Sequence, residues 1–256
     1  MGSFSGKHWI ITGGGSGMGS ASARLLHSLG ATVALWDMNP SVADRAAELE
    51  GTSSIVDVTQ PDAVASALSA TLAAFGKVDG VLHAAGIMKT GLVETLDAAS
   101  QARIIAINLG GSAVVAHTVI PALKPTRGSL VLFGSVAAFY GTPEFAAYAA
   151  SKAGVLSFAQ ALRIELEDAG VHVGVFCPHF VKTPMIGGDN KDASFINQKS
   201  IFVTQHEPEA MAKAIVHGIA ARQFLIVPSW RERLIYAMSR YAEFTGHLLM
   251  KQNWKA

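Results

Sequence analysis

Short runs of apolar and β-branched residues recur along the chain, and longer alanine-rich stretches with helical periodicity separate them. Runs of this length and composition indicate buried strands. They predict strands at His8–Thr12, Thr32–Trp36, Ser54–Val56, Val78–His83, Ser129–Gly134, Val171–Cys177 and Phe224–Val227. The stretches between them predict helices at Ala21–Leu29, Ala63–Phe75, Gln101–Leu123, Ala146–Ala169 and Glu209–Ala221.

This alternation of strands and helices predicts βαβ units, in which helices cover both faces of a parallel sheet. Right-handed crossovers then give a doubly wound, Rossmann-type sheet of about seven strands. The chain has 256 residues, 50% of them hydrophobic, and shows no repeat or linker. Such a length and composition suffice for one large core. We therefore expect a single α/β domain over residues 1–256.

Two segments depart from the alternation. Residues 182–206 form the least regular stretch, and the apolar residues Met185, Ile186, Phe195, Ile201 and Phe202 lie on both sides of its polar centre. This pattern predicts a substrate lid, with a plain surface loop as the alternative. Residues 230–250 place apolar side chains mostly on one helical face. We expect a C-terminal helical extension that packs on the body or on a sister subunit, lines a pocket, or contacts a membrane surface.

Composition and charge restrict the possible partners. The chain carries 20 basic and 19 acidic residues, for a net charge of +1, and has no long basic cluster. Nucleic acid is therefore not an expected partner. The single cysteine, Cys177, allows no internal disulfide, and we interpret it as a small apolar residue at a strand end. Without a secretory signal or a run of roughly 20 apolar residues, a cytoplasmic chain with no membrane span is expected. The nine histidines are scattered, so no metal site is predicted.

A glycine-rich loop, Thr12-Gly13-Gly14-Gly15-Ser16-Gly17-Met18-Gly19, follows the first strand and opens a helix. Alone it is compatible with a tight strand-to-helix turn, but in this context its amides favour a pyrophosphate. Asp37 ends the second strand about 20 residues later, where a carboxylate accepts hydrogen bonds from ribose hydroxyls. The same carboxylate would repel a 2′-phosphate, and Ser16 and Met38 supply no cation. The sequence therefore predicts NAD rather than NADP.

Candidate acid and base chemistry follows the fifth predicted strand. Ser135 comes directly after it, and Tyr148 and Lys152 occupy positions i and i+4 of the next helix, which share one face. Tyrosine ordinarily has a pKa near 10, so to act as a base near neutral pH its pKa must fall by about 2 to 3 units. This corresponds to about 3 to 4 kcal/mol of stabilisation of the phenolate. A cation about 4 Å away at an effective dielectric constant near 20 supplies about 4 kcal/mol. We therefore expect Lys152, together with the positive nicotinamide, to lower the pKa of Tyr148. Ser135 lacks the trailing glycine of a hydrolase nucleophile elbow.

Together these motifs resemble the short-chain dehydrogenase/reductase family, from Thr12 to about Thr183. The loop matches the family pattern Thr-Gly-x-x-x-Gly-x-Gly. Asn108, Ser135, Tyr148 and Lys152 match its Asn-Ser-Tyr-Lys catalytic tetrad. The resemblance implies that Tyr148 is the acid and base, that Lys152 also holds the nicotinamide ribose, that Ser135 orients the substrate oxygen, and that Asn108 positions a relay water.

The same resemblance implies a set of residues that contact the dinucleotide. They are Gly13, Ser16, Gly17, Met18, Gly19, Asp37, Asp57, Val58, Ala84, Ala85, Gly86, Tyr148, Lys152, Pro178, Val181 and Thr183. Thr183 would bond the nicotinamide carboxamide. Asp57 would bond the adenine edge, although an ordinary strand-end turn explains it equally well. Family members assemble through the two long helices, so a homodimer or homotetramer is expected.

Two places differ from the family pattern. The chain has His83-Ala84-Ala85-Gly86 where Asn-Asn-Ala-Gly is usual, and Pro178-His179 where Pro-Gly is common. The first difference leaves hydrogen bonds at the centre of the sheet to be made by another group. The second puts a side chain close to the nicotinamide, where His179 either shapes the substrate pocket or packs at the surface.

Apolar residues after Ser135, namely Val136, Ala137, Phe139 and Tyr140, predict an apolar substrate. We therefore expect an NAD-dependent dehydrogenase acting on a small hydrophobic secondary alcohol or its ketone, similar to a hydroxysteroid dehydrogenase. One alternative is a 3-oxoacyl reductase that uses NADPH, which Asp37 disfavours. Another is a non-catalytic NAD-sensing binding protein, which would not need Tyr148 and Lys152 together.

Overall fold

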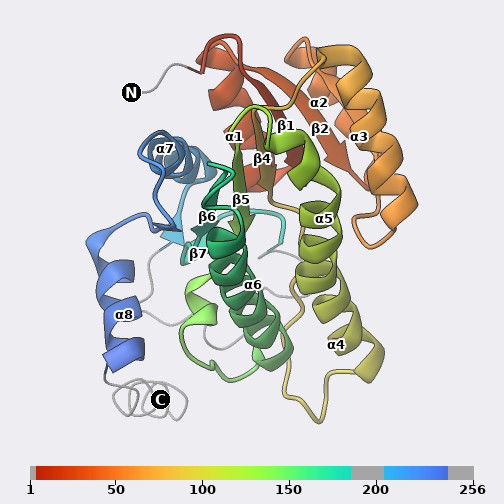
Figure 1. Ribbon diagram of the computed structural model, residues 1–256. Coiled ribbons are helices and arrows are strands. Elements are labelled where there is room, and N and C mark those ends of the chain that lie inside the picture. Colours follow the sequence, from red (N-terminus) through yellow and green to blue (C-terminus); the bar gives the residue numbers. More distant parts are fainter. Residues whose placement is uncertain (1–3, 186–204, 242–256) are drawn as a thin grey trace.

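The computed structural model describes residues 4–185 and 205–241. Seven parallel strands form one sheet in the order β3-β2-β1-β4-β5-β6-β9 (Figure 1). They are β1 (His8–Thr12), β2 (Thr32–Asp37), β3 (Thr52–Ile55), β4 (Gly80–His83), β5 (Ser129–Phe133), β6 (His172–Phe176) and β9 (Leu225–Ile226). The chain winds outward from β1 in one direction and from β4 in the other, which confirms the predicted doubly wound sheet.

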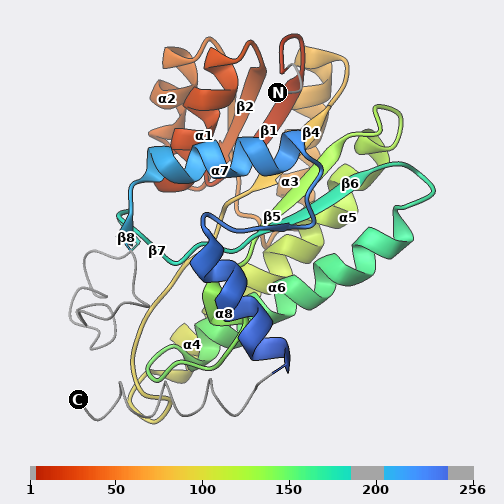
Figure 2. The same cartoon turned by 90° about the vertical axis from the view of Figure 1, so that its left-hand side faces the viewer.

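Helices cover both faces of this sheet (Figures 1 and 2). One layer contains α1 (Gly17–Ser28), α2 (Val42–Glu48) and α7 (Pro208–Ala220); the other contains α3 (Pro61–Phe75), α4 (Ala98–Ile105), α5 (Gly111–Leu123) and α6 (Ala146–Glu165). Successive strand residues point to opposite layers, so Ile10 belongs to one apolar core and Ile11 to the other. Burying each such side chain contributes about 1.5 to 3 kcal/mol. Burial on both faces explains why β4, β5 and β6 are largely apolar, whereas the edge strand β3 is polar and partly exposed.

The predicted single helix Gln101–Leu123 is interrupted. A π-helical turn, η1 (Ala106–Gly110), separates α4 from α5. Within it Asn108 accepts a 2.8 Å hydrogen bond from the backbone nitrogen of Ile87 and donates a 3.0 Å bond to the Ile87 carbonyl oxygen. A π turn holds one extra residue and is common at functional sites. The prediction of one regular helix was therefore wrong. The chain widens into a π turn where Asn108 bonds to Ile87, a loop residue distant in the sequence.

The continuous stretch Ala98–Leu123 is long and apolar enough to cross a membrane by length and composition. Its second half lies against the sheet, where Val115, Val119 and Leu123 are fully buried in the core. This position favours a core helix of a folded domain.

Several elements near the carboxyl edge of the sheet are short. Strands β7 (Phe180–Val181) and β8 (Gln205–His206) pair in parallel as a small second sheet. The helix α2 and this second sheet were not predicted, and other boundaries differ by a few residues. For example, α6 ends at Glu165 rather than Ala169, because the chain turns before Gly170, whose φ is +69°.

The predicted C-terminal helix is present as α8 (Trp230–Tyr241). It packs on the body beside the short 3₁₀ helix η2 (Val136–Ala138), where the rings of Phe139 and Tyr236 meet edge to face with centroids 4.9 Å apart. Its Glu232 carboxylate is buried and bonded to Ser229 and His206. Residues 186–204 of the predicted lid, and 242–250 of the predicted helix, lie outside the described residues.

Candidate active site

The glycine loop turns tightly between β1 and α1. A Cβ atom on Gly19 would stand 2.1 Å from the carbonyl oxygen of Gly13, and one on Gly13 would stand 2.8 Å from the backbone nitrogen of Ala85. Gly13 also has a φ of +65°, which favours glycine. Ser16 is the N-cap of α1 and makes no side-chain capping bond. The first amides of α1 are therefore presented at a close-packed backbone turn, which fits a pyrophosphate group.

The Asp37 carboxylate is fixed beside this loop. Its Oδ2 atom accepts a 3.0 Å hydrogen bond from the backbone nitrogen of Gly15, and its Oδ1 atom accepts a 2.9 Å bond from that of Asn39. Each carboxylate oxygen keeps a further lone pair. Asp37 therefore keeps acceptor capacity beside the glycine loop, and its predicted contact with a ribose stays a prediction.

A cleft of about 990 Å³ runs along the carboxyl edge of the sheet. Predicted coenzyme contacts that line it are Gly13, Ser16, Gly17, Met18, Gly19, Asp37, Asp57, Val58, Ala84, Ala85, Gly86 and Thr183. Residues that were not predicted also line it: Trp36, Met38, Val56, Ile87, Arg103, Ile107, Phe133, Pro184 and Met185. Arg103 and Ile107 belong to no motif, and only their i, i+4 spacing on one helical face could have suggested a shared role. The residues present fit a dinucleotide.

Of the two interpretations of Asp57, the structure supports the strand-end turn. Its Oδ1 atom accepts hydrogen bonds from the backbone nitrogen of Thr59 at 2.9 Å and from its hydroxyl at 2.7 Å, so it forms a strand-end turn. It also lines the cleft, so an adenine contact stays a prediction.

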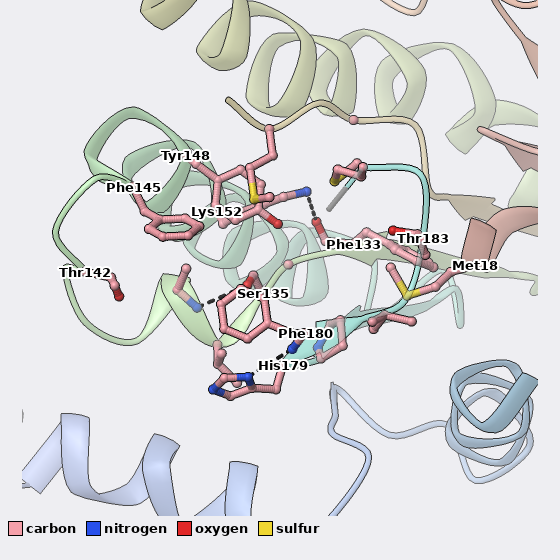
Figure 3. A pocket seen from close by; sticks show the side chains of 18 of the residues that line it. Met18, Phe133, Ser135, Thr142, Phe145, Tyr148, Lys152, His179, Phe180 and Thr183 are labelled. Atoms are coloured by element: carbon pink, nitrogen blue, oxygen red, sulfur yellow. Dashed lines mark hydrogen bonds between the residues drawn. The ribbon is translucent and has the colours of Figure 1, made fainter. Parts of the chain in front are cut away.

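A second pocket of about 810 Å³ joins this cleft (Figure 3). The two share Met18, Ala84, Gly86, Phe133, Thr183 and Met185. Four predicted coenzyme contacts, Tyr148, Lys152, Pro178 and Val181, line this pocket rather than the cleft, so their contact with a coenzyme stays a prediction. Val136, Ala137 and Tyr140 also line it, as predicted. Phe139 does not, because its ring packs on Tyr236 of α8 instead.

Ser135, Tyr148 and Lys152 converge in this pocket (Figure 3). The Ser135 hydroxyl accepts a 3.1 Å hydrogen bond from the backbone nitrogen of Ala137, so its own proton is directed elsewhere. The Ser135 and Tyr148 hydroxyls line the same pocket. The Lys152 ammonium donates a 2.7 Å bond to the Phe133 carbonyl oxygen and lies 5.7 Å from the centroid of the Tyr148 ring. The site thus holds a phenol between a hydroxyl and a cation.

Burial governs the charges of Tyr148 and Lys152 in this pocket. Burial raises the pKa of Tyr148 to about 12, although the nearby Ser135 hydroxyl opposes the change. Burial lowers the pKa of Lys152 to about 8. Desolvation thus sets the pKa of Tyr148 in the chain alone, and its lowering by Lys152 together with a bound nicotinamide stays a prediction. At neutral pH these residues hold Tyr148 protonated and Lys152 charged.

Asn108 is 1% exposed and lies behind the pocket, outside the described lining residues. Besides its two bonds to Ile87, its amide donates a 3.0 Å bond to the Ser151 hydroxyl. Ser151 in turn donates a 2.7 Å bond to the carbonyl oxygen of Tyr148. Asn108 therefore supports the helical turn that carries Tyr148, and its predicted role in holding a relay water stays a prediction.

His83 itself replaces the hydrogen bonds that the usual asparagine would make. The backbone nitrogen of Ala85 donates to the Thr12 hydroxyl at 3.1 Å, and this hydroxyl lies 2.8 Å from His83 Nδ1. The hydroxyl has one proton and two lone pairs, so the direction of its bond with Nδ1 depends on which ring nitrogen of His83 carries the proton. Burial lowers the pKa of His83 to about 3, so the ring is neutral. This bond links β1 to β4 at the point where the strand order reverses.

His179 both lines the pocket and packs against its neighbours. It lines the substrate pocket and is 8% exposed. Its Nδ1 atom accepts a 2.9 Å bond from the backbone nitrogen of Phe180, and the two rings pack with centroids 4.8 Å apart. The side chain therefore forms part of the pocket wall and is held there by packing.

Cys177 is fully buried in the core, where burial raises its thiol pKa to about 12, as its structural interpretation predicted. Within residues 4–185 and 205–241, no three histidine, cysteine or acidic side chains are grouped so that they could hold a metal ion.

A doubly wound sheet with a glycine loop, a carboxylate at the end of β2 and a Ser-Tyr-Lys group is typical of a dinucleotide-dependent oxidoreductase of the Rossmann type. The family model described as short chain dehydrogenase matches residues 7–194. The chain belongs to this family.

Relatives with different substrates resemble this chain. A 2-dehydro-3-deoxy-L-rhamnonate dehydrogenase (NAD(+)) of Sphingomonas is 38% identical to this chain. The match covers 72% of this chain and 76% of the relative's length. A 3-oxoacyl-[acyl-carrier-protein] reductase of Chlamydia muridarum is 33% identical, over 71% and 77%. An 11-beta-hydroxysteroid dehydrogenase of Arabidopsis thaliana is 28% identical, over 88% and 69%. A short chain dehydrogenase/reductase from Burkholderia phymatum, crystallised with NAD, superimposes with a TM-score of 0.81 at 26% identity and 97% coverage of both chains.

Proposed function

We propose that this chain is an NAD-dependent oxidoreductase that interconverts a small hydrophobic secondary alcohol and its ketone. One observation carries the proposal: Ser135, Tyr148 and Lys152 converge in a largely apolar pocket that opens into the dinucleotide cleft. A substrate oxygen between the Ser135 and Tyr148 hydroxyls would have its carbon at the junction of the two spaces.

The coenzyme is NAD, bound along the glycine loop with its adenosine ribose at Asp37. The fixed Asp37 carboxylate supports this choice, because it would repel a 2′-phosphate. The Sphingomonas relative is named as NAD-dependent, and the Burkholderia structure contains NAD. When bound, the nicotinamide supplies or accepts the hydride.

The chain's own residues handle the proton and the substrate oxygen. Because burial holds Tyr148 protonated, its hydroxyl can donate a proton to the ketone oxygen while the carbonyl group is reduced to an alcohol. The Ser135 hydroxyl donates a hydrogen bond to the same oxygen and holds it in place. Lys152 keeps a positive charge beside the phenol, which stabilises the phenolate that remains. In the reverse direction the phenolate takes the proton of the alcohol.

The substrate is apolar, because Met88, Val136, Phe145, Phe180 and Met185 line the pocket. A hydroxysteroid or a comparable alcohol is apolar in this way, and the name of the Arabidopsis relative supports that class. The name of the Chlamydia relative favours a second candidate, reduction of a 3-oxoacyl thioester.

Two panels test the proposal. The purified chain is mixed with NAD or NADP and a set of hydrophobic secondary alcohols that includes hydroxysteroids, and formation of the reduced coenzyme is followed by absorbance. In parallel, acetoacetyl thioesters are supplied with NADH or NADPH. Turnover of an apolar alcohol with NAD is expected. Activity confined to the thioester with NADPH would favour the second candidate, and coenzyme binding without any turnover would favour a sensor.

We also propose a cytoplasmic homodimer or homotetramer that assembles through the segment Gln101–Leu123, which spans the end of α4 and all of α5, and through α6. Exposed apolar side chains on these helices support this, since Ile105 is 43% and Ile164 is 74% exposed in the single chain. Size-exclusion chromatography with light scattering measures the assembly.

A further inference from the structure

The cleft proposed for the dinucleotide has an unusual balance of charge. Asp37 and Asp57 line it, and both are acidic. Among the described lining residues only Arg103 is a cation. The diphosphate of a dinucleotide carries two negative charges, and two nearby carboxylates disfavour its binding. The amides at the start of α1 offer only partial positive charge.

Arg103 lies where it can supply the missing charge. It stands in the last turn of α4, and it lines both the cleft and an adjoining groove of about 1120 Å³. Ser16 lines both spaces as well. Since Ser16 is the N-cap of α1, the guanidinium and the helix N-terminus border the same space from two different elements. A diphosphate at that N-terminus would lie between them.

No other partner within the structure accounts for Arg103. Its side chain makes no ion pair or hydrogen bond to any residue of the chain, by the distances found for residues 4–185 and 205–241. The other cation of the groove, Lys89, is bonded to Asp97 at 3.2 Å and to the Ser100 hydroxyl at 3.0 Å. The Arg103 side chain is exposed, so its charge carries no cost of burial.

We infer that Arg103, from α4, binds the coenzyme diphosphate together with the glycine loop. Arginine suits this role, because its planar group can bond two phosphate oxygens at once. The inference rests on the proposed dinucleotide but not on the proposed substrate. It assigns coenzyme binding to a residue outside the glycine loop and the tetrad.

Binding measurements on the purified chain test this role. Affinities of Arg103→Ala and Arg103→Lys for NAD, ADP-ribose, NADP and adenosine are obtained by calorimetry, or by competition with NADH fluorescence. Loss of one charge-assisted contact should weaken NAD and ADP-ribose about tenfold in Arg103→Ala and less in Arg103→Lys. Adenosine, which lacks phosphate, should bind unchanged. The difference from wild type should shrink as salt is raised.

The control is Lys124→Ala, which removes one exposed charge at the far end of α5 and should leave every affinity unchanged. Thermal melting shows whether each variant is folded. Wild-type affinity of Arg103→Ala for ADP-ribose would overturn the inference. An equal loss for adenosine would instead mean an adenine contact, and a loss confined to NADP would mean a 2′-phosphate contact. If the chain preferred NADP or turned over no alcohol, the proposed function would fail while the ADP-ribose result still decided the role of Arg103.

Discussion

Lys152 donates a 2.7 Å hydrogen bond from its ammonium to the carbonyl oxygen of Phe133, the last residue of β5. This bond joins α6 to the strand that leads into Ser135. Tyr148, one turn before Lys152, is thereby held at a fixed place relative to Ser135. The position of Tyr148 therefore depends on the buried Lys152 ammonium.

Removing that cation should change how stability depends on pH. Burial lowers the pKa of Lys152 to about 8, whereas an unfolded lysine titrates at 10.5. Between these values the unfolded chain binds more protons, so this group makes the fold more stable as pH rises from 8 to 10, by about 2 kcal/mol. Lys152→Met should lack this contribution. Urea unfolding of both proteins across this range measures it, and parallel curves would mean that Lys152 is not desolvated.

His83 should make the fold sensitive to acid. Its folded-state pKa is about 3 and its ordinary value 6.5, so only the unfolded chain binds a proton between them. This stability is present above pH 6.5 and is lost as pH falls toward 3. Between pH 7 and pH 5 the loss should be about 2 kcal/mol. His83→Asn, whose side chain can still bond Thr12, should lose about 2 kcal/mol less unfolding free energy than the wild type between pH 7 and pH 5. Equal losses in both proteins would show that the imidazole is not held neutral.

Asp37 should determine the choice of coenzyme. Asp37→Ser removes the carboxylate that would bond the ribose hydroxyls and repel a 2′-phosphate. The affinity for NAD should fall about tenfold while that for NADP rises. Asp57→Asn is a matched control, because it removes the other carboxylate of the cleft and can keep the turn with Thr59. An unchanged ratio of the two affinities in Asp37→Ser would refute the assignment.

The tight turn of the glycine loop should not tolerate a methyl group at Gly19. A Cβ atom there would stand 2.1 Å from the Gly13 carbonyl oxygen, so the loop must open. Gly19→Ala should cost about 1 to 3 kcal/mol of stability and weaken NAD binding. Gly110→Ala is the control, since its Cβ would have no neighbour within 4 Å and its φ is −59°. Calorimetry measures both effects, and similar behaviour of the two variants would contradict the close packing.

The pattern of apolar runs was enough to predict the central sheet, because strands buried on both faces carry the strongest signal. It missed α2, in which only Val42 and Ala46 are buried and the periodicity is too short to detect. The π turn around Asn108 was also missed, because it involves bonds to Ile87, which lies in a loop far from it along the chain.

At the site, the motifs located Ser135, Tyr148 and Lys152 correctly in one pocket. The protonation state of Tyr148 could not be derived from its spacing to Lys152, because burial decides it and burial depends on the whole fold. Arg103 carries no motif and comes to the cleft only through the position of α4. Local sequence patterns could therefore not predict the features that depend on contacts between distant segments.

The most direct test of the account is the turnover of Tyr148→Phe with an apolar alcohol and NAD, alongside its affinity for NAD. Tyr241→Phe, at a position 91% exposed on α8, serves as the control. If the Tyr148 hydroxyl transfers the proton, turnover should fall about 10²- to 10⁴-fold while NAD binds as in the wild type and the control stays active. Turnover of Tyr148→Phe close to the wild-type rate would contradict the account.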